Sequence, residues 1–165
     1  MRARGLKAMA ELQDELYSLL IPLAEQNLIV PRACVAEVVA YTDPVAGPGE
    51  ADWYLGDFEW NGNIVPILSF EAACGGPVPE ISRRTRVVVF FCIGARLKSG
   101  FFGVLTQGFP QLVRVSPGVL ETDTTAVQSD GSPVLCQVRM VNEKPVIPDL
   151  ERLEDMLIES VTTES

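Results

Sequence analysis

The feature that most constrains the fold is a short alternating segment that ends in Asn-Gly. Within residues 53–60, alternate positions of an extended chain lie on opposite sides. One side carries Tyr54, Gly56, Phe58 and Trp60, and the other carries Leu55, Asp57 and Glu59. A period of two predicts a half-exposed strand. Asn61 and Gly62 both tolerate positive φ, which a two-residue type I′ turn requires. Because residues 63–68 then return as a second apolar segment, the sequence predicts a β-hairpin.

Short apolar segments separated by turn-forming residues recur along most of the chain. Thirteen Gly and 12 Pro supply the turns. Besides the hairpin, we expect one helical turn at 70–74 and strands at 16–23, 28–30, 34–41, 86–93, 97–106, 107–115, 134–141 and 145–147. About nine or ten short strands at this spacing are typical of barrels or a sandwich. The predicted fold class is therefore mainly β.

The C-terminal segment has the periodicity of a helix rather than a strand. Over residues 149–161, the apolar side chains recur on one helical face, with Pro148 and Asp149 as the start signal. Glu151, Glu154 and Asp155 are predicted to lie on the solvated face near the helix N-terminus. Residues 1–15 are expected to be a short lead-in to a single domain at 16–165. A linker at 75–85 divides the strands into two groups of similar size.

Charge is distributed unevenly along the chain. The formal net charge is −9, and residues 33–82 contain eight Asp or Glu and no Lys or Arg. That half would repel a phosphate backbone, so nucleic-acid binding is not expected. The basic residues cluster at the N-terminus and at Arg83, Arg84 and Arg86. These clusters are read as solvated loops, and contact with an acidic partner remains the alternative.

The residue most often used as a general base and as a metal ligand is missing. The chain has no histidine, which removes the commonest general base and metal ligand. Its four cysteines, at 34, 74, 92 and 136, lack the close spacing of a zinc site. We therefore expect no metal, no cofactor and no enzyme activity. An enzyme that uses paired carboxylates is kept as an alternative, and it would need a pocket that holds a carboxylate with a raised pKa.

Nothing in the sequence predicts membrane insertion or export. The N-terminus lacks the apolar core of a signal peptide. The densest apolar run, residues 87–93, is far shorter than the roughly 20 residues that span a bilayer. We expect a cytoplasmic protein with reduced cysteines. The remaining profile, an acidic β-protein with exposed turns and aromatic residues, favours a protein-binding module.

The hairpin resembles the signature of the CheW-like family, the adaptor domains of bacterial chemosensory arrays. That signature is a strand ending in Gly-x-x-Asn-Leu-Arg-Gly, followed by an Ile-Val-Pro-Ile strand. Here the matching residues are Gly56, Gly62 and the run Ile64-Val65-Pro66-Ile67. Weaker similarity continues in order at 29–39, 86–89, 107–113 and 147–153. The resemblance covers residues 16 to 158.

The resemblance implies two intertwined five-stranded SH3-like β-barrels with a C-terminal helix. On this basis the first barrel is expected at 16–80, the second at 86–141 and the helix at 149–161. Family members are adaptors that couple the cytoplasmic tip of a chemoreceptor to the regulatory domain of a CheA-type histidine kinase, and they contact other CheW-like proteins. In the family, the glutamate that matches Glu37 lies on the receptor-facing side. The alternative is a small β-barrel interaction module outside chemotaxis, whose acidic half recruits a basic partner.

This chain departs from the signature in the turn itself. Asn61 stands where the family has Arg, Trp60 where it has Leu, and Ser69 where it has Asp. Such changes resemble those of ChpC-type accessory proteins of type IV pilus chemosensory systems, which control twitching motility. The predicted protein-binding residues are Glu37, Phe58, Trp60, Asn61, Gly62 and Ile64. A purely structural role in turn and core remains the alternative for the glycine and the apolar members of this set.

Overall fold

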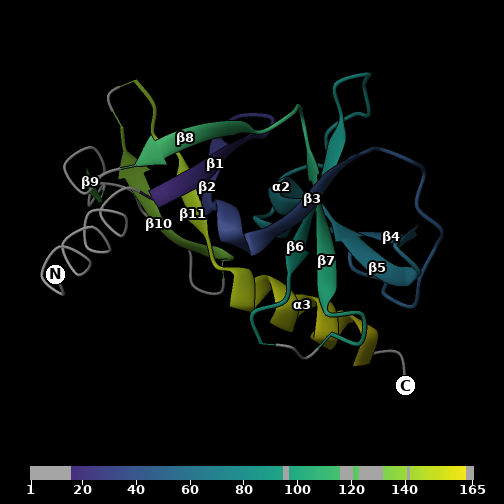
Figure 1. The fold of residues 1–165 in the computed structure, drawn as a ribbon. Helices are drawn as coiled ribbons and strands as arrows, with labels where there is room; N and C mark the ends of the chain where they lie inside the picture. Colours follow the sequence, from purple (N-terminus) through teal and green to yellow (C-terminus); the bar gives the residue numbers. More distant parts are fainter. Residues whose placement is uncertain (1–15, 95–96, 116–120, 123–131, 141, 163–165) are drawn as a thin grey trace, which may run out of the picture.

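Two β-sheets and a C-terminal helix make up the fold (Figure 1). The computed structural model describes residues 16–94, 97–115, 121–122, 132–140 and 142–162. The lead-in expected at 1–15 lies outside these residues. No helix within the described ranges is long and apolar enough to cross a membrane.

The first sheet has six strands, taken from both ends of the chain. Their order across the sheet is β8 (Gln111–Val115), β1 (Leu16–Pro22), β2 (Asn27–Pro31), β11 (Val146–Pro148), β10 (Val134–Arg139) and β9 (Glu121–Thr122). β1 and β2 form the hairpin expected at residues 16–30. β2 and β11 run parallel, which joins the N-terminal hairpin to the last strand of the chain.

The second sheet has five strands from the middle of the chain. Their order is β3 (Val35–Ala40), β6 (Arg86–Phe91), β7 (Phe101–Thr106), β5 (Asn63–Leu68) and β4 (Tyr54–Trp60). A 3₁₀ turn, η1 (Arg32–Cys34), carries the chain from β2 into this sheet, and the segment after β7 carries it back to β8. Among the described residues there are also two helices, α2 (Phe70–Ala73) and α3 (Leu150–Thr162).

The expected fold class, mainly β with a C-terminal helix, is confirmed, but the grouping of the strands is not. Dividing the chain into 16–80 and 86–141 is wrong as a description of the two sheets, because each sheet takes strands from both sides of the linker. The linker composition signals a loop and carries no information on which strands pair across it. The sequence also placed the start of β7 at 97 instead of Phe101, and it missed the two-residue β9.

One apolar core lies between the two sheets and α3. It contains Leu28 and Val30 from the six-stranded sheet, Phe90 and Phe102 from the five-stranded sheet, and Leu153 from α3, all at most 2% exposed. The rings of Phe90 and Phe102 stack with centroids 5.4 Å apart. In Figure 1 α3 runs beneath the sheets, which is the position from which its apolar face reaches this core.

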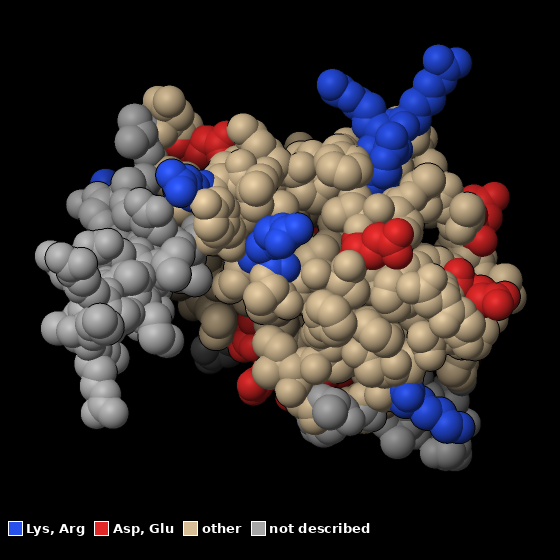
Figure 2. Space-filling view, in the orientation of Figure 1, with Lys and Arg blue, Asp and Glu red and all other residues tan. Residues whose placement is uncertain are grey.

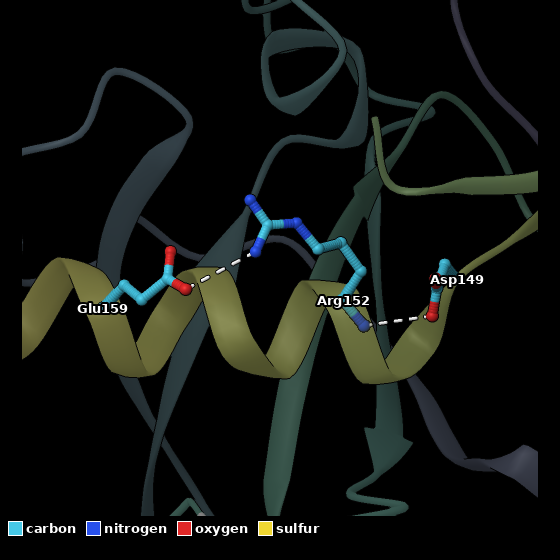
Figure 3. A network of polar contacts seen from close by, with 3 residues as sticks. All are labelled: Asp149, Arg152 and Glu159. Carbon is cyan, nitrogen blue, oxygen red and sulfur yellow. Dashed lines mark hydrogen bonds and ion pairs between the residues drawn. The ribbon is translucent and has the colours of Figure 1, made fainter. Parts of the chain in front are cut away.

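The start of α3 follows the predicted signal. Asp149 caps the helix, because its Oδ1 accepts the backbone N–H of Arg152 at 3.0 Å (Figure 3). The Arg152 guanidinium also lies 3.5 Å from a carboxylate oxygen of Glu159, two turns further along. This pair is exposed and contributes little to stability.

Glu154 is buried, which corrects the expectation that it faces solvent. Its side chain is fully inaccessible. One carboxylate oxygen accepts the backbone N–H of Ile93 at 3.1 Å, and both oxygens accept that of Gly94. These two donors lie in the segment that follows β6. Glu154 therefore ties the end of β6 to the helix and satisfies backbone groups that would otherwise be unpaired.

We expect Glu154→Gln to destabilise the fold by about 2 kcal/mol, because the amide presents N–H groups to backbone N–H groups. Urea unfolding followed by circular dichroism would measure the change. The matched control is Glu159→Gln on the same helix, whose carboxylate is exposed. We expect it to cost less than about 0.5 kcal/mol. Equal costs would show that the buried carboxylate does not hold β6 to α3.

Candidate protein-interaction surface

The Asn61-Gly62 turn has the geometry that its sequence predicts. Asn61 has a φ of 46° and Gly62 a φ of 78°, so both occupy the left-handed region that a type I′ turn needs. Trp60 and Asn63 face each other directly before and after the turn. The hairpin 53–68 is confirmed, and its tip is exposed.

Trp60 and Glu37 join the two edges of the five-stranded sheet. β3 and β4 lie at opposite ends of the strand order. Even so, the indole Nε1 of Trp60 on β4 donates a hydrogen bond of 2.6 Å to Oε2 of Glu37 on β3. The sheet must therefore curl until its edge strands approach each other at this end. The other oxygen of Glu37 has no hydrogen-bond partner among the described residues.

Two phenylalanines extend this contact into an aromatic cluster. The ring of Trp60 lies edge-on to that of Phe101, with centroids 4.8 Å apart. Phe101 in turn contacts Phe91, its cross-strand partner on β6, at 5.5 Å. Phe91 is 45% exposed. We call Glu37, Trp60, Phe91 and Phe101 the rim cluster, since they lie where the curled sheet opens to solvent.

Beneath the rim cluster, the inner face of the sheet is tightly packed. Its buried side chains are Val65, Ile67, Val87, Val89 and Leu105, all at most 1% exposed. Phe58 lies over Gly103 on this face. A Cβ at Gly103 would come within 2.8 Å of Val87 and 3.4 Å of Phe58. The missing side chain at Gly103 therefore makes room for Val87, while Phe58 lies at an ordinary contact distance.

The six predicted residues do not form one site. Glu37 and Trp60 are in contact, and Asn61 and Gly62 form the exposed turn next to them. Phe58 is partly buried and packs under the rim cluster. Ile64 is 62% exposed, but it pairs with Glu59 and so points to the other face of the sheet.

Ile64 instead lines an apolar groove between β5 and the C-terminal helix. The groove has a volume of about 410 Å³. Pro66 and Ile64 form one wall, and Leu157 and Ile158 of α3 form another. Lys98 is the one cationic side chain that lines it among the described residues.

Sequence reasoning missed Phe91 and Phe101, although a signal was present. The chain contains two aromatic doublets, Phe90-Phe91 and Phe101-Phe102, on strands that pair with each other. Side chains alternate along a strand, so each doublet must send one ring into the shared core and one to the opposite face. The pairing that brings the second rings together with Trp60 could not be read from the pattern.

Burial raises the pKa of several ionisable groups outside the rim cluster. Burial raises the pKa of Glu71, the carboxylate for which such a rise is resolved in the described part of the chain. Its Oε2 accepts the backbone N–H of Ala24 at 3.2 Å, and its Oε1 is buried with no hydrogen-bond partner among the described residues. Glu71 lines a hollow of about 420 Å³, so it is the described carboxylate closest to the condition set for an enzyme. Burial and the neighbouring Glu154 raise the pKa of the Cys92 thiol to about 12. The described residues contain no group of three or more potential metal ligands.

Comparison with known proteins identifies the family. A family model for the CheW-like domain matches residues 18–155. The chain belongs to the CheW-like domain family. Among solved structures, it is similar to the scaffolding protein TtCheW from Thermoanaerobacter tengcongensis, with a TM-score of 0.70 and 17% sequence identity over 84% of this chain and 86% of that one. That likeness supports the CheW-like fold. A search of curated protein sequences found no match.

The two glycines of the CheW-like hairpin should differ sharply in tolerance to a methyl group. Gly62→Ala adds strain at positive φ, but its Cβ would meet nothing within 4 Å. We therefore expect the free energy of unfolding to fall by about 1 kcal/mol. Gly56→Ala combines a φ of 125° with a contact of 2.5 Å to the carbonyl oxygen of Val45, so we expect about 3 kcal/mol or more. Urea unfolding of both variants tests this order, and equal costs would contradict it.

Cys92 should be a slow nucleophile in the folded protein. A rise in its pKa from 9.0 to about 12 lowers the thiolate fraction at pH 8 by about 1000-fold, so alkylation slows in proportion. Iodoacetamide labelling with mass spectrometry, on native and on urea-unfolded protein, gives the ratio of rates at this cysteine. Similar rates in both states would show that Glu154 and burial do not protect the thiol.

Proposed function

We propose that this chain is a non-catalytic adaptor in a bacterial chemosensory array. It couples the cytoplasmic tip of a chemoreceptor to the regulatory domain of a CheA-type histidine kinase, within the cytoplasm and without a cofactor. The departures of its hairpin from the family signature favour an array that controls type IV pili and twitching motility. Other CheW-like domains are further partners in such an array.

The observation that carries this proposal is the placement of Glu37 in the exposed rim cluster. The resemblance to the family assigns the matching glutamate to the receptor-facing side. In this chain the side chain is exposed, and its position is fixed by the Trp60 indole on the opposite edge strand. A carboxylate held in one orientation loses less conformational entropy on binding than a freely rotating one.

The composition of the rim cluster suits recognition of a protein. Its aromatic rings, of which Phe91 is exposed and Trp60 and Phe101 are partly buried, belong to the residue types that are enriched at interfaces. Because Asn61 replaces the arginine of the family, the rim presents a carboxylate without an adjacent cation from the turn. We infer that the partner supplies the positive charge, as a Lys or Arg that reaches the free oxygen of Glu37.

Binding should depend on Glu37 and not on the acidic residues of the hairpin 53–68. We expect Glu37→Lys to weaken binding to the purified kinase regulatory domain or receptor tip of the source organism by at least about 10-fold, because a like charge faces the partner's cation. Isothermal titration calorimetry measures this change. The matched control is Glu59→Lys, an equal charge change at an exposed position of β4 outside the rim cluster, and we expect it to bind almost as wild type.

Three results would count against the proposal. If wild type binds neither the kinase domain nor the receptor tip, the adaptor role fails. If both charge variants bind equally, the adaptor role stands and the rim cluster is not its contact surface. Salt-sensitive capture of a basic protein unrelated to chemosensing would favour the alternative, an interaction module outside chemotaxis. Circular dichroism of each variant confirms that it is folded.

A further inference from the structure

Three arginines of this acidic protein form one wall of a concavity. The adaptor proposal does not use this concavity. Arg83, Arg84 and Arg86 lie before and at the start of β6, and they line a hollow of about 490 Å³. Its other wall is the segment after β7, residues 107–109, together with Pro22. The two walls are neighbours because Arg86 pairs directly with Thr106. The concavity thus lies on a fixed part of the sheet.

Acidic side chains of the described residues do not neutralise the positive charge at this concavity. No Asp or Glu of the described chain forms an ion pair with any of the three arginines. Arg86 is held in place, since its guanidinium donates to the carbonyl oxygens of Arg83 at 3.0 Å and Thr85 at 2.9 Å. Arg83 and Arg84 are exposed. Figure 2 shows basic side chains that project together from the upper edge of this face, above the start of β6.

The floor of the concavity adds an unpaired donor and an apolar contact. The amide nitrogen of Gln107 is buried and makes no hydrogen bond. A buried donor without an acceptor is costly, and rotation of the Gln107 amide toward a carboxylate in the concavity would remove that cost. Beside it, Phe109 is 69% exposed. Arginine and aromatic side chains together are enriched where proteins bind one another.

We propose that this concavity binds an acidic protein segment that carries an apolar residue next to its carboxylates. The Arg83 and Arg84 guanidiniums provide bidentate partners for carboxylates, and Phe109 provides the apolar contact. A nucleic acid fits less well, since the formal charge of −9 repels a long phosphate backbone. This surface is separate from the rim cluster and does not depend on the adaptor role.

The test uses a fluorescein-labelled peptide of alternating Glu and Leu, with fluorescence anisotropy at low and at physiological salt. We expect saturable binding that weakens with salt. Arg83→Glu/Arg84→Glu should weaken it by at least about 10-fold. The matched control is Arg32→Glu/Arg139→Glu, an equal charge change at exposed residues outside the concavity, and we expect a loss below about 3-fold. Phe109→Ala keeps every charge and should weaken binding by about 3- to 10-fold.

Several outcomes would overturn the proposal. They are an absence of binding at about 1 mM peptide, equal losses in the two double variants, or equal binding of a peptide with Lys in place of Glu. Binding to phosphatidylglycerol vesicles but not to the peptide, with loss in Arg83→Glu/Arg84→Glu, would assign the concavity to a membrane surface instead. Thermal unfolding of each variant ensures that a lost signal reflects the surface and not the fold.

Discussion

The structure depends on one apolar core that both sheets and the C-terminal helix build together. β2 enters it from one sheet, β6 and β7 from the other, and α3 from below. Truncating Phe90 or Phe102 to Ala would lower the free energy of unfolding by about 3–5 kcal/mol. That is a large part of the roughly 5–15 kcal/mol by which a domain is typically stable. Neither sheet can therefore be expected to fold without the other.

The shared core also determines which face of the sheet carries the rim cluster. Alternate residues of β6 and β7 are committed to the core, so the residues between them must point to the opposite face. There, Phe91 and Phe101 meet Trp60, and the Trp60–Glu37 hydrogen bond brings the edge strands together. Binding side chains on paired strands keep a more defined geometry than side chains on a free loop.

The local structure was predictable from the sequence to a large extent. The 53–68 hairpin and the 149–161 helix follow from period, turn residues and capping, which are properties of neighbouring residues. The sheet composition was not predictable in this way, because the parallel pairing of β2 with β11 joins segments more than 100 residues apart. Glu154 was assigned to solvent for a similar reason. Its partners, the backbone N–H groups of Ile93 and Gly94, are distant in sequence and leave no local pattern.

The candidate site was likewise predictable only where it depends on neighbouring residues. The sequence identified Glu37 and Trp60 separately, and only the curl of the sheet puts them in contact. Ile64 was grouped with them as a residue of the matching hairpin, although alternation along β5 sends it to the other face. The basic concavity was visible as an arginine cluster, but its other wall at 107–109 comes from a segment that follows a different strand.

The most direct test of the central claim uses the two tryptophans of the chain. Trp60 belongs to the rim cluster, whereas Trp53 is partly buried against the shared core and serves as an internal reference. In ¹⁵N-labelled protein, each indole N–H gives its own signal in a two-dimensional NMR spectrum. On titration with the kinase regulatory domain or the receptor tip, we predict that the Trp60 signal shifts or broadens while the Trp53 signal keeps its position. An unchanged Trp60 signal at saturation with both partners would contradict a binding role for the rim.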